Sequence, residues 1–306
     1  MAAIKDLHQL VQDLKDKPSR RVAIAAGHDP NTIVAAGRAA AENIAAITLV
    51  GDRERIETLC TEFGIDAGVF TIVDEKDVLK AGAKAVAMVR SGEADVLMKG
   101  LIATSDYMKL ILNKQEGLLP AGNILSHVTV LELPAYIKTH GKLLFVADVA
   151  IIPRPDLETK VQILNFCVKA ANSFGVENPC AAIIAATEKV SDRMKATVDA
   201  AELTRRNREG EITGCVVDGP LALDVALSPE ACKIKGLDSP VNGSADILVF
   251  PNIESGNVFY KSSTLLSGAR LAAAVVGTSA PCVLTSRADD EESKFLSIAM
   301  GCRLVD

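Results

Sequence analysis

Short apolar runs alternate with segments of helical period along most of this chain, and that alternation is the strongest constraint on its fold. Runs rich in valine, isoleucine and alanine, such as 20–27 and 94–100, are typical of strands buried on both faces. A longer segment follows each run, and its apolar residues recur every three or four positions, as in an amphipathic helix. The sequence therefore predicts an α/β fold, with a parallel sheet covered by helices.

This rhythm changes near residue 120. The runs 122–134 and 141–153 are strand-like, but the segment between them has no room for a crossover helix. Antiparallel pairing, or a move to a second sheet, is therefore expected. We predict two α/β domains with a cleft between them, where small-molecule sites usually lie. The first domain would comprise 1–134 and 278–306, and the second 135–277.

Helix and strand patterns alternate again after this boundary. The predicted elements are a helix at 156–175, a strand at 180–186, a helix at 191–207, strands at 214–219 and 245–251, a long helix at 255–277, a strand at 281–286 and a final helix at 289–301. The last strand and helix are expected to return to the first sheet.

Composition excludes several classes of function. The net charge is -6 and the basic residues are dispersed, so nucleic acid is not an expected partner. Seven cysteines without a CxxC pair or zinc-type spacing indicate buried thiols in a reducing cytoplasm. The charged amphipathic start differs from a signal peptide, and no uncharged apolar run reaches about 18 residues. We therefore expect a cytoplasmic protein without a membrane partner.

The stretch "VLTSRADDEESKFLSIAMG" at 283–301 is the first candidate site. It places Ser286 and Arg287 at the carboxyl end of a predicted strand, beside the start of a helix. Free backbone N–H groups and an arginine fork at such a position bind phosphate or carboxylate. A plain alternative is that the serine caps the helix and that the acids, which include Asp290 and Glu292, complement its dipole.

Several stretches together resemble one family, the phosphate acyltransferases, and its butyryl branch in particular. They are "LMKGLIATSDYMKLIL" (97–112), "ILSHVTVLELP" (124–134), "VADVAIIPRPDLETKVQI" (146–163), "EKVSDRMKATVDA" (188–200), "VDGPLALDVALS" (217–228), "GSADILVFPNIESGNVFYK" (243–261) and the closing "SRADDEESKFLSIA". The resemblance implies acyl transfer between coenzyme A and inorganic phosphate. It also implies two α/β domains similar to those of isocitrate and isopropylmalate dehydrogenases, and a homodimer or higher homo-oligomer.

The same resemblance implies roles for the residues of the first candidate site. Arg287 would bind the phosphoryl group, and Ser286 would donate a hydrogen bond to the thiol or the oxyanion. Both substrates, a coenzyme A thioester and inorganic phosphate, would react directly in a ternary complex, without a permanently bound cofactor or a metal. The general base would be Glu292 or, as a second candidate, Asp290. Alternatively, cations and N–H groups would lower the pKa of the thiol directly.

Further candidates lie at other strand ends. Lys99 and Gly100 follow one strand, and Thr104 and Ser105 begin the next helix, which makes a second anion site or simply a cap. The resemblance implies that Lys109 meets coenzyme A and that Ser126 lies near the phosphate. The remaining candidates are His127, which is also typical of a satisfied core group, and Asp148, which would be a structural or a catalytic acid of the cleft. Asp218 and Gly219, together with Asn257, would line the coenzyme A or acyl pocket.

Three alternatives remain open at the level of sequence. Acetyl or propionyl groups would serve the same chemistry as a butyryl group, because each methylene changes binding by only about 1–3 kcal/mol. A metal- and nicotinamide-dependent decarboxylating dehydrogenase would share the general fold, but the loop "AAGHDP" lacks a GxGxxG fingerprint. A non-catalytic protein that binds acyl-CoA is the third alternative.

Overall fold

The chain divides into two compact units in the computed structural model, which describes residues 2–285 and 290–305. The N-terminal unit comprises Leu7–Leu125 and Ala272–Asp306, and the central unit comprises Met1–Asp6 and Ser126–Leu271. The divisions therefore fall before residues 126 and 272, nine and six positions ahead of the boundaries expected from the sequence, and Met1–Asp6 belongs to the central unit.

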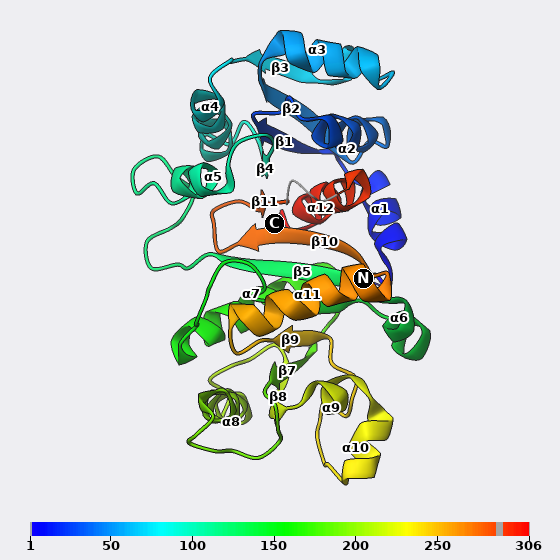
Figure 1. Ribbon diagram of the computed structural model, residues 1–306, viewed down its shortest axis with the longest axis vertical. Helices are drawn as coiled ribbons and strands as arrows, with labels where there is room; N and C mark the ends of the chain where they lie inside the picture. Colours follow the sequence, from blue (N-terminus) through cyan, green and yellow to red (C-terminus); the bar gives the residue numbers. More distant parts are fainter. Residues whose placement is uncertain (1, 286–289, 306) are drawn as a thin grey trace. The chain divides into compact units, whose positions relative to one another are not determined.

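The N-terminal unit alternates strands and helices in chain order (Figure 1). Its elements are α1 (Leu7–Lys15), β1 (Arg20–Ala25), α2 (Pro30–Ala41), β2 (Ala45–Gly51), α3 (Arg53–Glu62), the 3₁₀ turn Ala67–Val69, β3 (Thr71–Asp74), α4 (Val78–Arg90), β4 (Val96–Lys99), α5 (Thr104–Ile111), β10 (Arg270–Val276), β11 (Cys282–Val283) and α12 (Glu291–Arg303). The strand order is β3-β2-β1-β4-β11-β10, and all neighbours pair in parallel except β10 with β11.

Aspartates fix where three of these helices begin. Asp29, Asp52 and Asp77 are the N-cap residues of α2, α3 and α4, and each side chain accepts hydrogen bonds from backbone N–H groups of the first turn. Such a cap satisfies donors that have no partner inside the helix. These acids follow or closely follow a strand, so the helices start at the carboxyl edge of the sheet.

The last strand and helix return to this sheet, as predicted. Strand β11 pairs in parallel with β4, with Cys282 beside Leu97 and Val283 beside Met98. Helix α12 packs against α1 and α2 (Figure 1). The carboxyl end of β11 therefore lies at the same edge of the sheet as the carboxyl ends of β1 and β4.

The central unit also alternates helices and strands. Its elements are β5 (Ser126–Glu132), α6 (Pro134–His140), β6 (Leu144–Ala147), α7 (Leu157–Ser173), β7 (Cys180–Ile184), α8 (Lys195–Arg208), β8 (Val216–Leu221), α9 (Leu223–Leu227), α10 (Pro229–Lys235), β9 (Ile247–Val249) and α11 (Ile253–Ser267). The strand order is β5-β6-β9-β7-β8. Strands β5 and β6 are antiparallel, as predicted, although the short helix α6 lies between them.

One predicted element is wrong. The sequence favoured a single helix over 255–277, but α11 ends at Ser267 and Arg270–Val276 is the strand β10. Gly268 is the C-cap residue at φ 64°, a left-handed conformation that favours glycine and stops the helix. The alanines of β10 favour a helix intrinsically, so the sequence pattern did not mark the break.

The α/β class predicted from the alternation is confirmed in both units. The buried residues are mostly aliphatic, and tightly packed strands such as Val96–Lys99 have every residue buried. Across the described ranges, every helix is too short or too polar to cross a membrane.

Candidate functional site

The central pair of the predicted site, Ser286 and Arg287, lies outside the described residues. The described chain resumes at Asp290, which is the N-cap of α12 and accepts a hydrogen bond from the Ser293 N–H at 2.8 Å. Thr285, two residues after the end of β11, is buried.

Lys99 is a buried cation at the carboxyl end of β4. Lys99 is only 3% exposed, and its Nζ donates a hydrogen bond to the Gly100 carbonyl at 3.2 Å. A Cβ at Gly100 would lie 2.3 Å from the Ala26 carbonyl oxygen, so only glycine lets the loops after β1 and β4 approach this closely. The sequence prediction of Lys99 and Gly100 at a strand end corresponds to this position.

The predicted site residues of helix α5 are exposed to solvent, in contrast to the buried Lys99. Ala103 occupies the N-cap, so neither Thr104 nor Ser105 caps the helix, and both are exposed. The Lys109 side chain is 77% exposed and forms an ion pair with Asp106 at 3.1 Å. These three residues form a solvent-facing group, separate from the buried Lys99.

Glu292 is held by an arginine of the neighbouring helix. Its carboxylate forms an ion pair with Arg38 of α2, which also pairs with Glu42 at 2.8 Å. Burial alone would lower the pKa of Arg38, but its hydrogen bonds to the two glutamates outweigh that effect and raise it. The Arg38 guanidinium also lies 3.7 Å from the centre of the Phe295 ring, a cation–π contact.

A buried lysine on α12 was not among the predicted residues. The Lys294 side chain is 4% exposed, and its Nζ donates to the Asp29 carboxylate at 2.8 Å and to the Thr32 hydroxyl at 3.2 Å. Burial would raise the pKa of Asp29, yet the bonds from Lys294 and Thr32 lower it. The sequence feature that could have identified Lys294 is the presence of a lysine within the apolar pattern of the last helix.

Asp148 is the hydrogen-bonding centre of a second group, in the central unit. One carboxylate oxygen accepts from the Ser126 hydroxyl and from the His127 N–H, both at 3.1 Å. The other accepts from the N–H groups of Ala150 and Ile151, both at 2.8 Å. This buried acid therefore joins the start of β5 to the loop after β6.

Helix α11 also contacts the group around Asp148. The Asn257 amide donates to the Val149 carbonyl at 2.9 Å, and a Cβ at Gly256 would lie 2.5 Å from the Asp148 carbonyl oxygen. His127 is buried, and its Nδ1 lies 3.2 Å from the Thr129 hydroxyl. Four predicted residues, Ser126, His127, Asp148 and Asn257, are thus brought together around one loop.

Asp218 and Gly219 lie at another strand, β8. The Ser239 hydroxyl donates to the Asp218 carboxylate at 2.6 Å, and Arg208 lies 3.6 Å away. A Cβ at Gly219 would lie 2.9 Å from Ile183, so glycine is needed for close strand packing. These contacts do not include the residues around Asp148.

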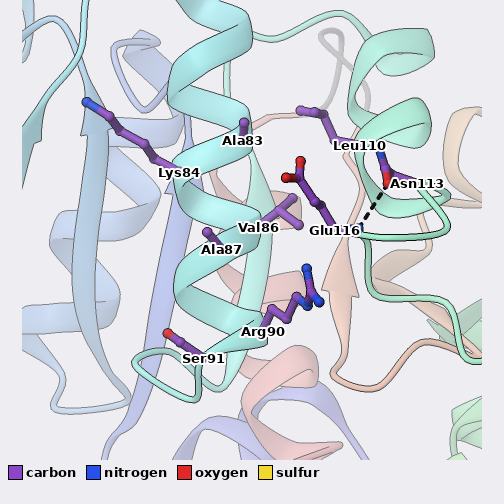
Figure 2. A pocket seen from close by; sticks show the side chains of 9 residues that line it. All are labelled: Ala83, Lys84, Val86, Ala87, Arg90, Ser91, Leu110, Asn113 and Glu116. Carbon is purple, nitrogen blue, oxygen red and sulfur yellow. Dashed lines mark hydrogen bonds between the residues drawn. The ribbon is translucent and has the colours of Figure 1, made fainter.

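A cavity of about 580 Å³ lies in the N-terminal unit between α4 and the segment that follows α5 (Figure 2). Its lining includes Val86, Arg90, Leu110 and Glu116. The predicted site residues do not line this cavity. Within the described ranges, no three His, Cys, Asp or Glu side chains gather as a metal site requires.

Comparison with known proteins decides the family. The model of the family described as "Phosphate acetyl/butaryl transferase" matches residues 6–83 and 76–302. The chain belongs to this family.

The acyltransferase relatives cover almost the whole chain. A phosphate butyryltransferase of Clostridium acetobutylicum is 44% identical over 97% of both chains, and a phosphate acetyltransferase of Thermotoga maritima is 40% identical over 96% of this chain and 98% of its own. The crystal structure of a branched-chain phosphotransacylase from Enterococcus faecalis covers 94% of this chain and 99% of its own, with a TM-score of 0.80 and 34% identity. The predicted resemblance is confirmed.

Proposed function

We propose that this protein is a phosphate acyltransferase that converts butyryl-CoA and inorganic phosphate into butyryl phosphate and free coenzyme A. The observation that carries the proposal is the full-length likeness to a phosphate butyryltransferase at 44% identity. The structural likeness to a branched-chain phosphotransacylase supports an acyl group larger than acetyl.

The reaction is a direct acyl transfer in a ternary complex. A phosphate oxygen attacks the thioester carbonyl, the C–S bond breaks, and the leaving thiolate takes up one proton. We propose that Arg287 binds the phosphoryl oxygens, and that Ser286 donates to the oxyanion or the thiol. Donors fixed where charge develops are the strongest contribution that such a site can make.

The cysteines of the chain support a mechanism without a covalent enzyme intermediate. Six of the seven are buried. Burial raises the pKa of Cys215 to about 11 and that of Cys302 to about 12. A thiol with such a pKa is almost wholly protonated at neutral pH, and the thiol form is a poor nucleophile.

The buried cation Lys99 supports a second contact with a substrate anion. It lies at the end of β4, the strand that pairs with β11 just before the segment containing Arg287. We propose that Lys99 and Gly100 bind substrate phosphate groups, with Thr104, Ser105 and Lys109 forming the outer part of the coenzyme A site. Lysine supplies a point charge for this contact, whereas an arginine would supply a fork.

The group around Asp148 is proposed to orient substrate. Asp148 accepts four hydrogen bonds, so its role is to hold the loop of residues 149–151 and the hydroxyl of Ser126 in place. We propose that Ser126, with His127 and Asn257 beside it, contacts the acyl phosphate. Asp218 and Gly219 are proposed to line the pocket for the acyl group or coenzyme A.

The general base is proposed to be Glu292, with Asp290 as the second candidate. Asp290 already caps α12, and the Glu292 carboxylate is paired with Arg38. The base would act in the reverse direction, in which the coenzyme A thiol loses its proton as it attacks butyryl phosphate and phosphate leaves. Proton transfer from a thiol to an ordinary carboxylate is uphill by about 6 kcal/mol. A base-free route, in which nearby cations lower the pKa of the coenzyme A thiol, therefore stays the alternative.

Four further expectations stay predictions. They are the cleft between two domains, the likeness to isocitrate and isopropylmalate dehydrogenases, the cytoplasmic location, and the homodimer or higher homo-oligomer. No permanently bound cofactor is proposed, and the coenzyme A thioester and inorganic phosphate act as substrates.

The experiment is a comparison of acetyl-, propionyl-, butyryl- and isobutyryl-CoA with phosphate, followed by release of free thiol. A pocket fitted to four carbons should favour butyryl or isobutyryl over acetyl by at least about tenfold in kcat/KM, since each methylene is worth about 1–3 kcal/mol. Preference for acetyl-CoA would instead assign the acetyl branch, for which the Thermotoga maritima relative is the precedent.

The same assay distinguishes an acyltransferase from a dehydrogenase and from a non-catalytic binding protein. A dehydrogenase would reduce a nicotinamide nucleotide in the presence of a divalent metal and leave acyl-CoA intact. A non-catalytic protein would bind butyryl-CoA without releasing thiol. Either result would contradict the proposed function.

A further inference from the structure

The cavity between α4 and the turn after α5 combines an apolar lining with two charged side chains (Figure 2). Its volume of about 580 Å³ lies within the usual range for small-molecule sites, about 300–1,000 Å³. Val86 and Leu110 contribute the largest part of the apolar lining, and Ala83 and Ala87 complete it. A lining of this kind favours a ligand with an aliphatic group, because burial of that group against it is favourable.

The two charged side chains, Arg90 and Glu116, reach into the cavity from facing sides (Figure 2). Within the described residues, neither the guanidinium nor the carboxylate forms a hydrogen bond or an ion pair, with each other or with a third group. Lys84 is a second cation of the lining, but Glu75 holds it at 2.8 Å on the far side of α4. Arg90 is therefore the cation that remains for a ligand, and Glu116 is the anion.

The turn that carries Glu116 is fixed by its own hydrogen bonds. The Asn113 side-chain oxygen accepts from the N–H groups of Gln115 and Glu116, both at 2.9 Å. The Gly117 N–H donates to the Asn113 carbonyl at 2.8 Å, and a Cβ at Gly117 would lie 2.3 Å from the Ile111 carbonyl oxygen. Glu116 is thus held in place without a ligand, which lowers the entropic cost of binding.

The cavity is separate from the proposed substrate residues of this unit. A Cβ at Gly82 would lie 2.6 Å from Leu110, so α4 and α5 pack directly there, and the cavity lies beyond this contact, toward Arg90. Arg90 ends α4 shortly before β4 begins at Val96, whereas Lys99 ends β4. A ligand near Arg90 is therefore neither of the two reacting substrates, and this inference does not rest on the proposed function.

We propose that this cavity binds a free α-amino acid with an aliphatic side chain, such as leucine or valine. The Arg90 guanidinium binds the α-carboxylate, to which its planar fork is matched, and the Glu116 carboxylate binds the α-ammonium. The aliphatic side chain packs on Val86 and Leu110. A ligand with a single charge would leave one of the two protein charges unpaired, whereas a zwitterion with an apolar group satisfies the whole cavity.

The first experiment measures binding by isothermal titration calorimetry, with the wild-type chain and without thioester or phosphate. L-leucine should bind with a Kd below about 1 mM. Three analogues each lack one of its groups: isocaproate lacks the ammonium, isopentylamine lacks the carboxylate, and glycine lacks the side chain. Each should bind at least about tenfold more weakly, because a hydrogen bond to a charged group, or burial of an aliphatic side chain, is worth at least that factor.

The second experiment repeats the titrations with variants of the two charged residues. Arg90→Ala and Glu116→Gln should each weaken L-leucine binding by about tenfold or more. In Arg90→Ala, L-leucine should bind no better than isopentylamine, because the partner of the carboxylate is gone. In Glu116→Gln, it should bind no better than isocaproate, because the charged partner of the ammonium is gone.

The apolar part of the cavity is tested by filling it. Ala87 is exposed on α4, so Ala87→Phe places a ring in the cavity without disturbing the core, and it should abolish L-leucine binding. Arg53→Ala and Glu57→Gln are the matched controls, since these two residues pair at 3.3 Å on the surface of α3 and lie outside the cavity. Both controls should keep the wild-type affinity.

Three results would overturn the proposal. The first is a wild-type chain that does not bind L-leucine at up to about 20 mM. The second is isocaproate binding as tight as that of L-leucine, which would make the cavity a site for simple anions. The third is L-leucine binding that is unchanged in Arg90→Ala, Glu116→Gln and Ala87→Phe, which would place the amino acid elsewhere. Circular dichroism of each variant checks that the fold is retained. Loss of the proposed acyl transfer with these titrations as expected would contradict the proposed function alone.

Discussion

Single residues in this protein determine the local structure around the proposed site, and Asp148 is the clearest case. Its two oxygens accept four hydrogen bonds while the residue is 2% exposed. A buried carboxylate without hydrogen-bond partners is strongly disfavoured, so these four bonds are needed to keep Asp148 buried. The same bonds fix the hydroxyl of Ser126 and the loop beside Asn257.

We predict that Asp148→Asn destabilises the central unit by about 1–3 kcal/mol, because the amide NH₂ would oppose two of the present donors. Urea unfolding measures the change. Asp106→Asn is the control, since Asp106 makes a surface ion pair with Lys109 that is worth about 0–1 kcal/mol. Equal stability losses in the two variants would contradict the role given to Asp148.

The buried pair Lys294 and Asp29 gives a prediction about pH. Folding lowers the pKa of Asp29 from its ordinary value of 3.8, against the effect of burial and through bonds from Lys294 and Thr32. Its stabilising contribution is therefore complete above that ordinary value and is lost as the pH falls through the lower folded pKa.

The variant Lys294→Met should accordingly lose less stability than the wild type when the pH falls below about 4. Thermal unfolding at a series of pH values measures this difference. Lys76→Met is a surface control, since Lys76 is 61% exposed and pairs with Glu54 at 3.3 Å. A Lys294→Met profile parallel to that of the wild type would show that the pair does not set the pKa of Asp29.

At the scale of elements, capping residues decide where helices start, and α5 is an exception. Asn252 caps α11 by accepting from the Ser255 N–H at 2.9 Å, whereas Ala103 at the start of α5 has no side chain that can do so. The backbone of Ala103 is extended, as an N-cap requires.

We predict that Ala103→Ser stabilises the chain by about 0.5–1 kcal/mol and that Asn252→Ala destabilises it by about 1 kcal/mol, each through one cap hydrogen bond. The midpoint of urea unfolding measures both changes. A stabilising Asn252→Ala, or a destabilising Ala103→Ser, would mean that contacts outside the caps dominate these helix ends.

These elements could be predicted from the sequence where its apolar periodicity was strong. The prediction failed where one stretch was compatible with both a helix and a strand. The strands before residue 100 and the return of the last strand were visible because apolar runs and helical segments alternate cleanly. The helix predicted over 255–277 was wrong because the alanines of β10 fit both a helix and a buried strand. The break at Gly268 depends on one left-handed residue, which periodicity does not register.

The candidate site was predictable only in part for a related reason. Lys99 and Gly100 follow a strand directly, so their position could be inferred from the chain order. The contact between Ser126 and Asp148 depends on the antiparallel pairing of β5 with β6, and Lys294 meets Asp29 from the far end of the chain. Such contacts are set by tertiary packing, which a single sequence does not display.

At the scale of the whole molecule, the two compact units each hold part of the proposed machinery. The N-terminal unit contains Lys99, Arg287 and Glu292, and the central unit contains Ser126, Asp148 and Asn257. Membership in a family of acyltransferases indicates the reaction. Arg287 is the residue on which the proposed chemistry depends most.

The most direct test of this account follows thiol release from butyryl-CoA with phosphate, in the wild type and in Arg287→Ala. The control is Lys76→Ala, an exposed lysine outside the proposed site. We predict phosphate-dependent release by the wild type and by the control, and a loss of about 100-fold or more in Arg287→Ala, with its circular dichroism spectrum unchanged. An unchanged rate in Arg287→Ala, or thiol release that does not require phosphate, would contradict the account.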